Sequence, residues 1–276
     1  MTPFRSIRFA RLPSGLTLPY LEQGRPTGCP VLFLHGITDS CRSFGPVLAH
    51  LPGSVHAIAP SQRGHGNASL PETYRLVDFA TDLAAFMDEL GLERAIVVGH
   101  SMGASVAQRF ALDHPERVGG LILVGAFAAL RRNPDLVAFG ETEVMQLKDP
   151  VDPTFVRAFQ ESTLARPIPE PMLNLFVAES LKVPACVWRA AWAGLMDADL
   201  TPELSRISAP TLLVWGNKDT MALWSEQHSI LRAVPDARCE TFLGAGHALH
   251  WEEPARFATL VADFAAACGS VAASAA

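Results

Sequence analysis

Hydrophobic and polar positions follow two different periods along the chain, and together they predict an α/β domain. Short continuous apolar runs, typical of strands buried on both faces, occupy residues 31–34, 55–59, 95–98, 118–124 and 211–215, and residues 238–243 are predicted to form a last strand. Residues 76–90 and 104–112 instead carry apolar side chains at helical spacing. Residues 6–23 alternate apolar and polar side chains around a Pro-Ser-Gly turn, which predicts an antiparallel hairpin at a sheet edge. The chain of 276 residues is long enough for one large domain of this class.

The apolar run at residues 95–98 ends on a glycine-flanked serine, Ser101, and a helical pattern begins directly after it. A serine in so sharp a strand-to-helix turn has a strained backbone, so the positions two before and two after it must lack side chains. Gly99 and Gly103 meet this requirement. The turn would raise the Ser101 hydroxyl to the top of the sheet and aim the Met102 amide at a developing oxyanion. The alternative is a glycine-rich turn without chemistry.

Three more loops at predicted strand ends carry candidate groups. Gly36 lets the chain turn after its strand, which makes the Ile37 amide a candidate second oxyanion donor or part of an ordinary turn. Asp219 could orient a histidine, or it could cap a turn. His247 follows a Gly-Ala-Gly stretch that can place an imidazole over the sheet edge, and it is the candidate base. His250 is its local competitor.

Residues 127–207 depart from the core pattern because they combine helical periodicity with repeated prolines. We interpret this stretch as a helical lid inserted into a core made of residues 1–126 and 208–276. A lid of this size must lie over the Ser101 end of the sheet, so some of its apolar residues should line a pocket. Each of them could instead bury the lid against the core. The candidates are Met145, Phe155, Phe159, Met172, Phe176, Trp188 and Trp192.

Charge and composition narrow the possible functions. The net charge of −6, without a run of Lys and Arg, gives no electrostatic footprint for nucleic acid or an anionic membrane, and this favours an uncharged small-molecule substrate. No apolar run approaches the roughly 18 to 20 residues that span a bilayer, and no export signal is visible, so a soluble cytoplasmic protein is expected. The five widely spaced cysteines favour reduced thiols over disulfides or a metal site. Residues 269–276 are expected to be disordered.

The chain order Ser101, Asp219, His247 is accompanied by four motifs: Leu34-His35-Gly36, Gly99-His100-Ser101-Met102-Gly103, Trp215-Gly216-Asn217-Lys218-Asp219, and Gly246-His247 followed by Glu253-Pro254. With these motifs the sequence resembles the α/β-hydrolase superfamily, and specifically its lid-bearing serine carboxylesterase-like members. The resemblance implies a mostly parallel central sheet with helices on both faces and an inserted lid. In one departure, Ser61 stands where the family loop commonly has an aspartate, which removes the usual anchor of Arg63.

These residues predict a serine hydrolase that cleaves neutral carboxylic esters or lactones through an acyl-enzyme on Ser101, without metal or organic cofactor. His247 would move the proton, Asp219 would orient the imidazole, and the Ile37 and Met102 amides would bind the oxyanion. Within the family, carbon–carbon bond hydrolases and cofactor-free perhydrolases use the same three residues. Outside enzymes, some relatives that keep the triad act as small-molecule receptors. The sequence leaves the choice of acyl and alcohol groups and the oligomeric state open.

Overall fold

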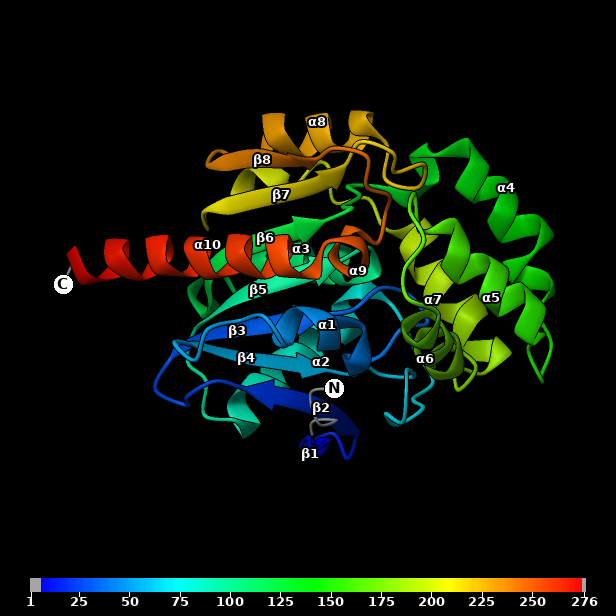
Figure 1. Cartoon of the computed structure of the whole chain (residues 1–276), viewed down its shortest axis with the longest axis horizontal. Coiled ribbons are helices and arrows are strands. Elements are labelled where there is room, and N and C mark those ends of the chain that lie inside the picture. The colour runs from blue at the N-terminus through cyan, green and yellow to red at the C-terminus, as the bar shows by residue number, and fades with distance from the viewer. Residues whose placement is uncertain (1–5, 275–276) are drawn as a thin grey trace.

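The structure is a computed structural model that describes residues 6–274 (Figure 1). Within this range eight strands form one sheet in the order β1-β2-β4-β3-β5-β6-β7-β8. The hairpin strands pair antiparallel with each other, and β2 pairs antiparallel with β4, whereas all pairs from β4 to β8 are parallel. The strands are β1 (Arg8–Arg11), β2 (Thr17–Gln23), β3 (Cys29–Leu34), β4 (Val55–Pro60), β5 (Ala95–His100), β6 (Val118–Val124), β7 (Thr211–Gly216) and β8 (Ala237–Phe242).

Helices cover both faces of this sheet. In chain order the α-helices of the described residues are α1 (Gly45–Leu48), α2 (Leu76–Glu89), α3 (Met102–Asp113), α4 (Pro134–Thr142), α5 (Pro153–Ser162), α6 (Glu170–Ser180), α7 (Ala185–Asp197), α8 (Trp224–Ala233), α9 (Leu249–Glu252) and α10 (Pro254–Ser274). Alternate strand residues face two separate hydrophobic clusters. Val97 lies in the cluster with α2 and α3, whereas Ile96 and Val98 lie in the cluster with α1 and α10. The continuous apolar runs in the sequence therefore arise because both faces of the central strands are buried.

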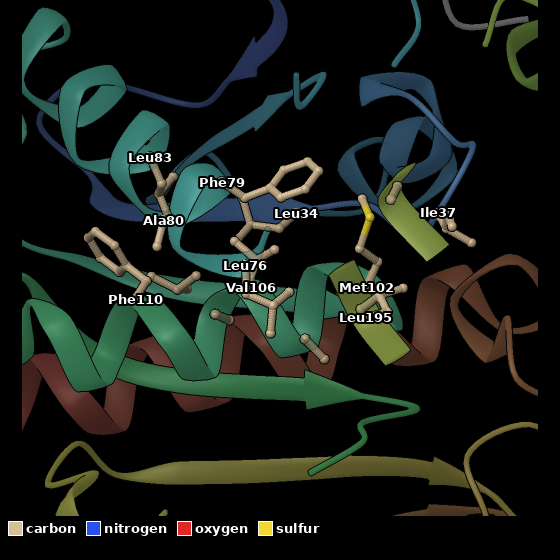
Figure 2. Packing of buried hydrophobic residues seen from close by; sticks show 14 of the residues in the cluster. Leu34, Ile37, Leu76, Phe79, Ala80, Leu83, Met102, Val106, Phe110 and Leu195 are labelled. Carbon is tan, nitrogen blue, oxygen red and sulfur yellow. The ribbon is translucent and has the colours of Figure 1, made fainter. Parts of the chain in front are cut away.

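Helices α2 and α3 lie against each other on one face of the sheet. Figure 2 shows Phe79 and Leu83 of α2 close to Val106 and Phe110 of α3, and all four side chains are buried in one cluster. The helical spacing that predicted these two helices is thus the spacing of the residues that bury them. This packing holds the beginning of α3, directly after Ser101, at the carboxyl end of β5.

Helices α4–α7 lie in the connection between β6 and β7, within residues 127–207 for which the sequence predicts helical periodicity. In Figure 1 they stand together beside the end of the sheet toward which the parallel strands point. Helix α10 runs to Ser274, so most of the tail that was expected to be disordered is helical, and residues 275–276 lie outside the described range. None of the described helices is both long and apolar enough to cross a membrane.

Candidate active site

Ser101 lies between the end of β5 and the beginning of α3 with φ 54° and ψ −117°, a backbone conformation that side-chain-bearing residues rarely adopt. The turn is so tight that a Cβ atom on Gly99 would lie 2.2 Å from the carbonyl oxygen of Gly103. A Cβ atom on Gly103 would lie 2.1 Å from the carbonyl oxygen of Leu34. Both glycines are therefore required by backbone contact, and strain of this kind is typical of functional sites.

Asp219 and His247 form a buried pair at the ends of β7 and β8. Nδ1–H of His247 donates to Oδ2 of Asp219 at 2.8 Å, and both side chains are at most 3% exposed. The other carboxylate oxygen, Oδ1, accepts the backbone amides of Met221 at 2.8 Å and Ala222 at 2.9 Å. Both interpretations of Asp219 therefore hold: Oδ2 orients His247, and Oδ1 caps the turn. The capping bonds immobilise the carboxylate that holds the imidazole.

The remaining ring nitrogen of His247 is left for chemistry. Because Nδ1 carries the proton given to Asp219, Nε2 has a free lone pair; it is buried and has no hydrogen-bond partner among the described residues. His247 and Ser101 line the same cavity. On the other side of the ring is Gly125, at the end of β6 with φ 52°, where a Cβ atom would lie 2.7 Å from Nδ1. Gly125 is a residue whose importance the sequence analysis did not find.

The two candidate oxyanion donors also lie at this end of the sheet. Met102 is the first residue of α3, where amides have no acceptor within the helix. Ile37 lies in the loop after β3, and the hydrogen bonds of the described residues include none from its amide. Ile37 and Leu195 both line the cavity, and Figure 2 shows them beside Met102. The arrangement can therefore present two backbone N–H groups near Ser101.

The cavity is small and mostly apolar, with about 30 Å³ of free space, room for about two water molecules. Helices α4, α5 and α7 supply Leu136, Phe159, Trp192 and Leu195 to its wall. Its other apolar lining residues are Ile37, Phe127, Leu130, Met221 and Trp251. Among the described residues that line it there is an aspartate, Asp39, but no Lys or Arg. A neutral ligand is suited to such a wall, because an anion would find no counter-ion there.

Of the seven candidate pocket residues, the structure brings Phe159 and Trp192 to the cavity wall and places the other five elsewhere. Met145 is 46% exposed. Phe155 and Trp188 contact each other, with ring centroids 5.6 Å apart. Met172 packs in the small cluster where the ring of Phe176 stacks on that of Trp251. These five side chains bury the helices against one another or against the core, or face solvent.

His250, the competing candidate base, and Arg63, which lacks an acid at position 61, both have structural partners. His250 is fully buried, does not line the cavity, and has Nε2 3.3 Å from Oγ of Ser43. Burial lowers the pKa of His250 to about 3, so it is neutral and is a poor candidate for a base near pH 7. Arg63 is held by Asp82 through two hydrogen bonds of 2.6 and 2.7 Å. Asp82, on α2, thus replaces the acid that position 61 lacks.

Three polar residues of the site were missed by sequence reasoning. Asp39, in the loop after β3, is 4% exposed, and burial raises its pKa to about 7. Gln160, on α5, is 1% exposed and follows Val156 at helical spacing, so a glutamine on the buried stripe was the available signal. His100 donates from Nε2–H to the backbone carbonyl of His247 at 3.1 Å. No local pattern distinguishes His100 from a histidine that merely fills the turn.

Comparisons with known proteins agree with this geometry. Residues 30–254 match a family model described as the alpha/beta hydrolase fold. The chain is 30% identical to 2-hydroxy-6-oxononadienedioate/2-hydroxy-6-oxononatrienedioate hydrolase 2 of Pseudomonas putida, over 94% of this chain and 96% of that protein. It is 28% identical to 2-hydroxy-6-oxo-6-phenylhexa-2,4-dienoate hydrolase of Burkholderia cepacia, over 87% and 88%. The structure of an esterase from Rhodococcus sp. ECU1013 superposes with a TM-score of 0.81 at 26% identity, over 95% and 98%.

Proposed function

The chain belongs to the α/β-hydrolase fold family, and from this premise we propose that it is a serine hydrolase of neutral carboxylic esters or lactones. The observation that carries the proposal is the buried 2.8 Å contact between His247 and Asp219, which leaves Nε2 free in the cavity that Ser101 lines. A serine hydroxyl that lines the same cavity as a base oriented by a carboxylate is suited to act as an activated nucleophile.

The proposed reaction has two stages. Nε2 of His247 accepts the Ser101 proton while Oγ attacks the ester carbonyl carbon, and the resulting oxyanion accepts hydrogen bonds from the Ile37 and Met102 amides. Asp219 keeps Nδ1 protonated and stabilises the imidazolium. The intermediate collapses to the acyl-enzyme as Nε2 returns the proton to the departing alkoxide. Water then attacks the acyl carbon with the same base, which releases the acid and restores Ser101.

The charge of the cavity wall favours an ester over the substrates that the relatives' names describe. The dienoates in those names are carboxylate anions. The described lining residues here offer no Lys or Arg, and Asp39 would face such an anion with a carboxyl group. Taking an unpaired anion out of water into this site would be costly. Carbon–carbon bond hydrolysis remains the second candidate because the two named relatives match nearly the whole chain.

We further propose that helices α4–α7 act as a lid. Support comes from the cavity, whose free space of about 30 Å³ is far smaller than the roughly 300 Å³ or more of a ligand pocket. Three of these helices contribute its wall, so they or their side chains must move to admit an ester. An apolar wall of this kind also limits the access of water to the oxyanion.

Turnover of a series of 4-nitrophenyl esters and of a 2-hydroxy-6-oxo-dienoate separates the candidates. We expect ester kcat/KM to exceed dienoate kcat/KM by at least about 100-fold, because the described lining residues offer the dienoate carboxylate no Lys or Arg. Ser101→Ala should lower ester turnover about a millionfold. The reverse preference would replace esterolysis by carbon–carbon bond hydrolysis. Labelling of Ser101 by a phosphonate without multiple turnover of either substrate would favour a receptor.

A further inference from the structure

Four buried polar side chains join helices α5 and α6 to the loop that carries Ile37. Nε2 of Gln160 donates to Oγ of Ser180 at 2.6 Å and to Oδ1 of Asp39 at 3.2 Å. The hydroxyl of Thr38 donates to Oγ of Ser180 at 3.3 Å and lies 3.4 Å from Nε2 of Gln160. All four residues are at most 4% exposed. We name this set, Thr38, Asp39, Gln160 and Ser180, the Gln160 cluster.

The cluster holds the two residues that directly follow Ile37. Thr38 has φ 68°, a left-handed conformation that costs a residue with a β-branched side chain about 1–2 kcal/mol. The amide of Asp39 donates to the carbonyl of Gly36 at 3.3 Å, which closes a tight turn around Ile37. A turn of unfavourable conformation persists only where surrounding contacts maintain it. Gln160 contacts the side chains of both residues that follow Ile37, so it bears directly on the direction of the Ile37 amide.

We propose that Gln160 is a positioning residue that aims the Ile37 amide at the oxyanion. The inference rests on the proposed function. It adds to the site a residue that lies on α5, whereas the other proposed catalytic groups lie on loops of the core. Gln160 lines the cavity but acts through Asp39 and Thr38. Since Gln160 is on α5, the oxyanion donor is held in place only while α5 stands against the loop. Displacement of α5 to admit substrate would release the turn, and closure would rebuild it.

The first test replaces Gln160 by methionine, which keeps the length of the side chain and removes its hydrogen bonds. Loss of one oxyanion donor costs about 10²- to 10³-fold in kcat, and a misdirected donor should cost less, so we expect kcat to fall about 10- to 100-fold with KM within about threefold. Gln23→Met is the matched control, because Gln23 also gives up a hydrogen bond of 3.1 Å, to the carbonyl of Leu51, at the opposite end of the sheet. Its kcat should be unchanged.

The second measurement separates positioning from a general loosening of the pocket. An aryl trifluoromethyl ketone forms a tetrahedral oxyanion on a nucleophilic serine, whereas the matching methyl ketone reports ground-state binding. In Gln160→Met the inhibition constant of the trifluoromethyl ketone should rise by the same factor as kcat falls, and that of the methyl ketone should stay within threefold. Equal weakening of both ketones, or wild-type kcat, would overturn the proposal.

A double variant that exchanges the amide and the carboxyl group between positions 160 and 39 tests whether activity can be restored. Recovery of activity would also show that the loss in a single variant is not a loss of folding. Gln160→Glu alone sets two carboxyl groups against each other, and Asp39→Asn alone leaves Gln160 a neutral amide oxygen as its acceptor in place of the carboxyl group. Combined, the two substitutions restore one amide and one carboxylate, so kcat should recover at least tenfold over Gln160→Glu. No recovery in a folded double variant would contradict the role of this contact.

The ketone measurements also distinguish the two proposals. A wild-type protein that forms the Ser101 adduct, seen by fluorine NMR, but turns over no ester would contradict the proposed function and still report the effect of Gln160→Met on the adduct. A wild-type protein that hydrolyses esters while Gln160→Met binds the trifluoromethyl ketone unchanged would contradict only the role of Gln160. Absence of the adduct in a wild-type protein would contradict both proposals.

Discussion

Replacement of Gly125 by alanine should displace the His247 ring and lower activity, although no proposed catalytic residue is itself substituted. Gly125 has φ 52°, and a Cβ atom there would lie 2.7 Å from Nδ1 of His247 and 3.3 Å from Oδ2 of Asp219. Ordinary van der Waals contact begins at 3.4 Å, so the imidazole has to retreat by about 0.7 Å. The steric contact falls on Nδ1, the nitrogen that donates the 2.8 Å hydrogen bond to Asp219.

The expected loss lies between two limits. Misplacement of a catalytic group by about 1 Å costs about 10²-fold, and loss of the orienting carboxylate contact costs about 10⁴-fold. We therefore expect kcat of Gly125→Ala on an aryl ester to fall between about 10²- and 10⁴-fold. The positive φ should cost about 1–2 kcal/mol of the free energy of unfolding in addition.

Gly91→Ala is the matched control for the backbone cost. Gly91 has φ 65°, and nothing lies within 4 Å of its added Cβ atom. This variant should lose a similar amount of stability, measured by urea unfolding, and retain wild-type kcat. A folded Gly125→Ala protein with kcat within about threefold of the wild type would refute the reasoning, because the contact between His247 and Asp219 would then not set the rate.

Three further predictions concern stability and selectivity. Burial lowers the pKa of both His35 and His250 to about 3. Between about pH 6.5 and pH 3 only the unfolded chain gains these protons, so the free energy of unfolding measured in urea should decrease by about 1.4 kcal/mol for each histidine per pH unit as the pH falls. Burial raises the pKa of Asp39 to about 7; from about pH 4 to 7 only the unfolded chain loses this proton, so wild type should lose stability relative to Asp39→Asn by about 1.4 kcal/mol per pH unit as the pH rises, and a flat difference would contradict the burial argument. Trp192→Ala should shift kcat/KM toward longer acyl esters by about 10- to 100-fold, whereas Trp188→Ala, which removes a fully buried ring outside the cavity, should cost about 3–5 kcal/mol of stability and leave the long-to-short ratio unchanged.

The sequence by itself determined the features that depend on near neighbours in the chain. Apolar runs located the buried strands because both faces of a parallel sheet exclude water, and helical spacing located α2 and α3. The turn around Ser101 was also predictable from its two glycines. The need for Gly99 is local, because a Cβ atom there would meet the carbonyl oxygen of Gly103, whereas a Cβ atom on Gly103 would meet Leu34 of a neighbouring strand. The hairpin of β1 and β2 followed from alternation and its Pro-Ser-Gly turn.

Only the tertiary structure decided which side chains meet. His247 and His250 are three residues apart and chemically alike, and folding brings one to Asp219 and the other to Ser43. A helical stripe shows which face of a helix is buried but not what covers it, so Phe159 and Trp192 reach the cavity while Trp188 packs within the helical segment.

The same limit applies to the polar contacts of the site. Gln160 meets Asp39 across 121 positions of the chain, a pairing that no local pattern encodes. Gly125 looks like any strand-ending glycine until His247, 122 residues further on, is placed against it. Strand, helix and turn preferences act over a few residues, whereas the site is assembled from loops that come together only when the whole sheet has formed.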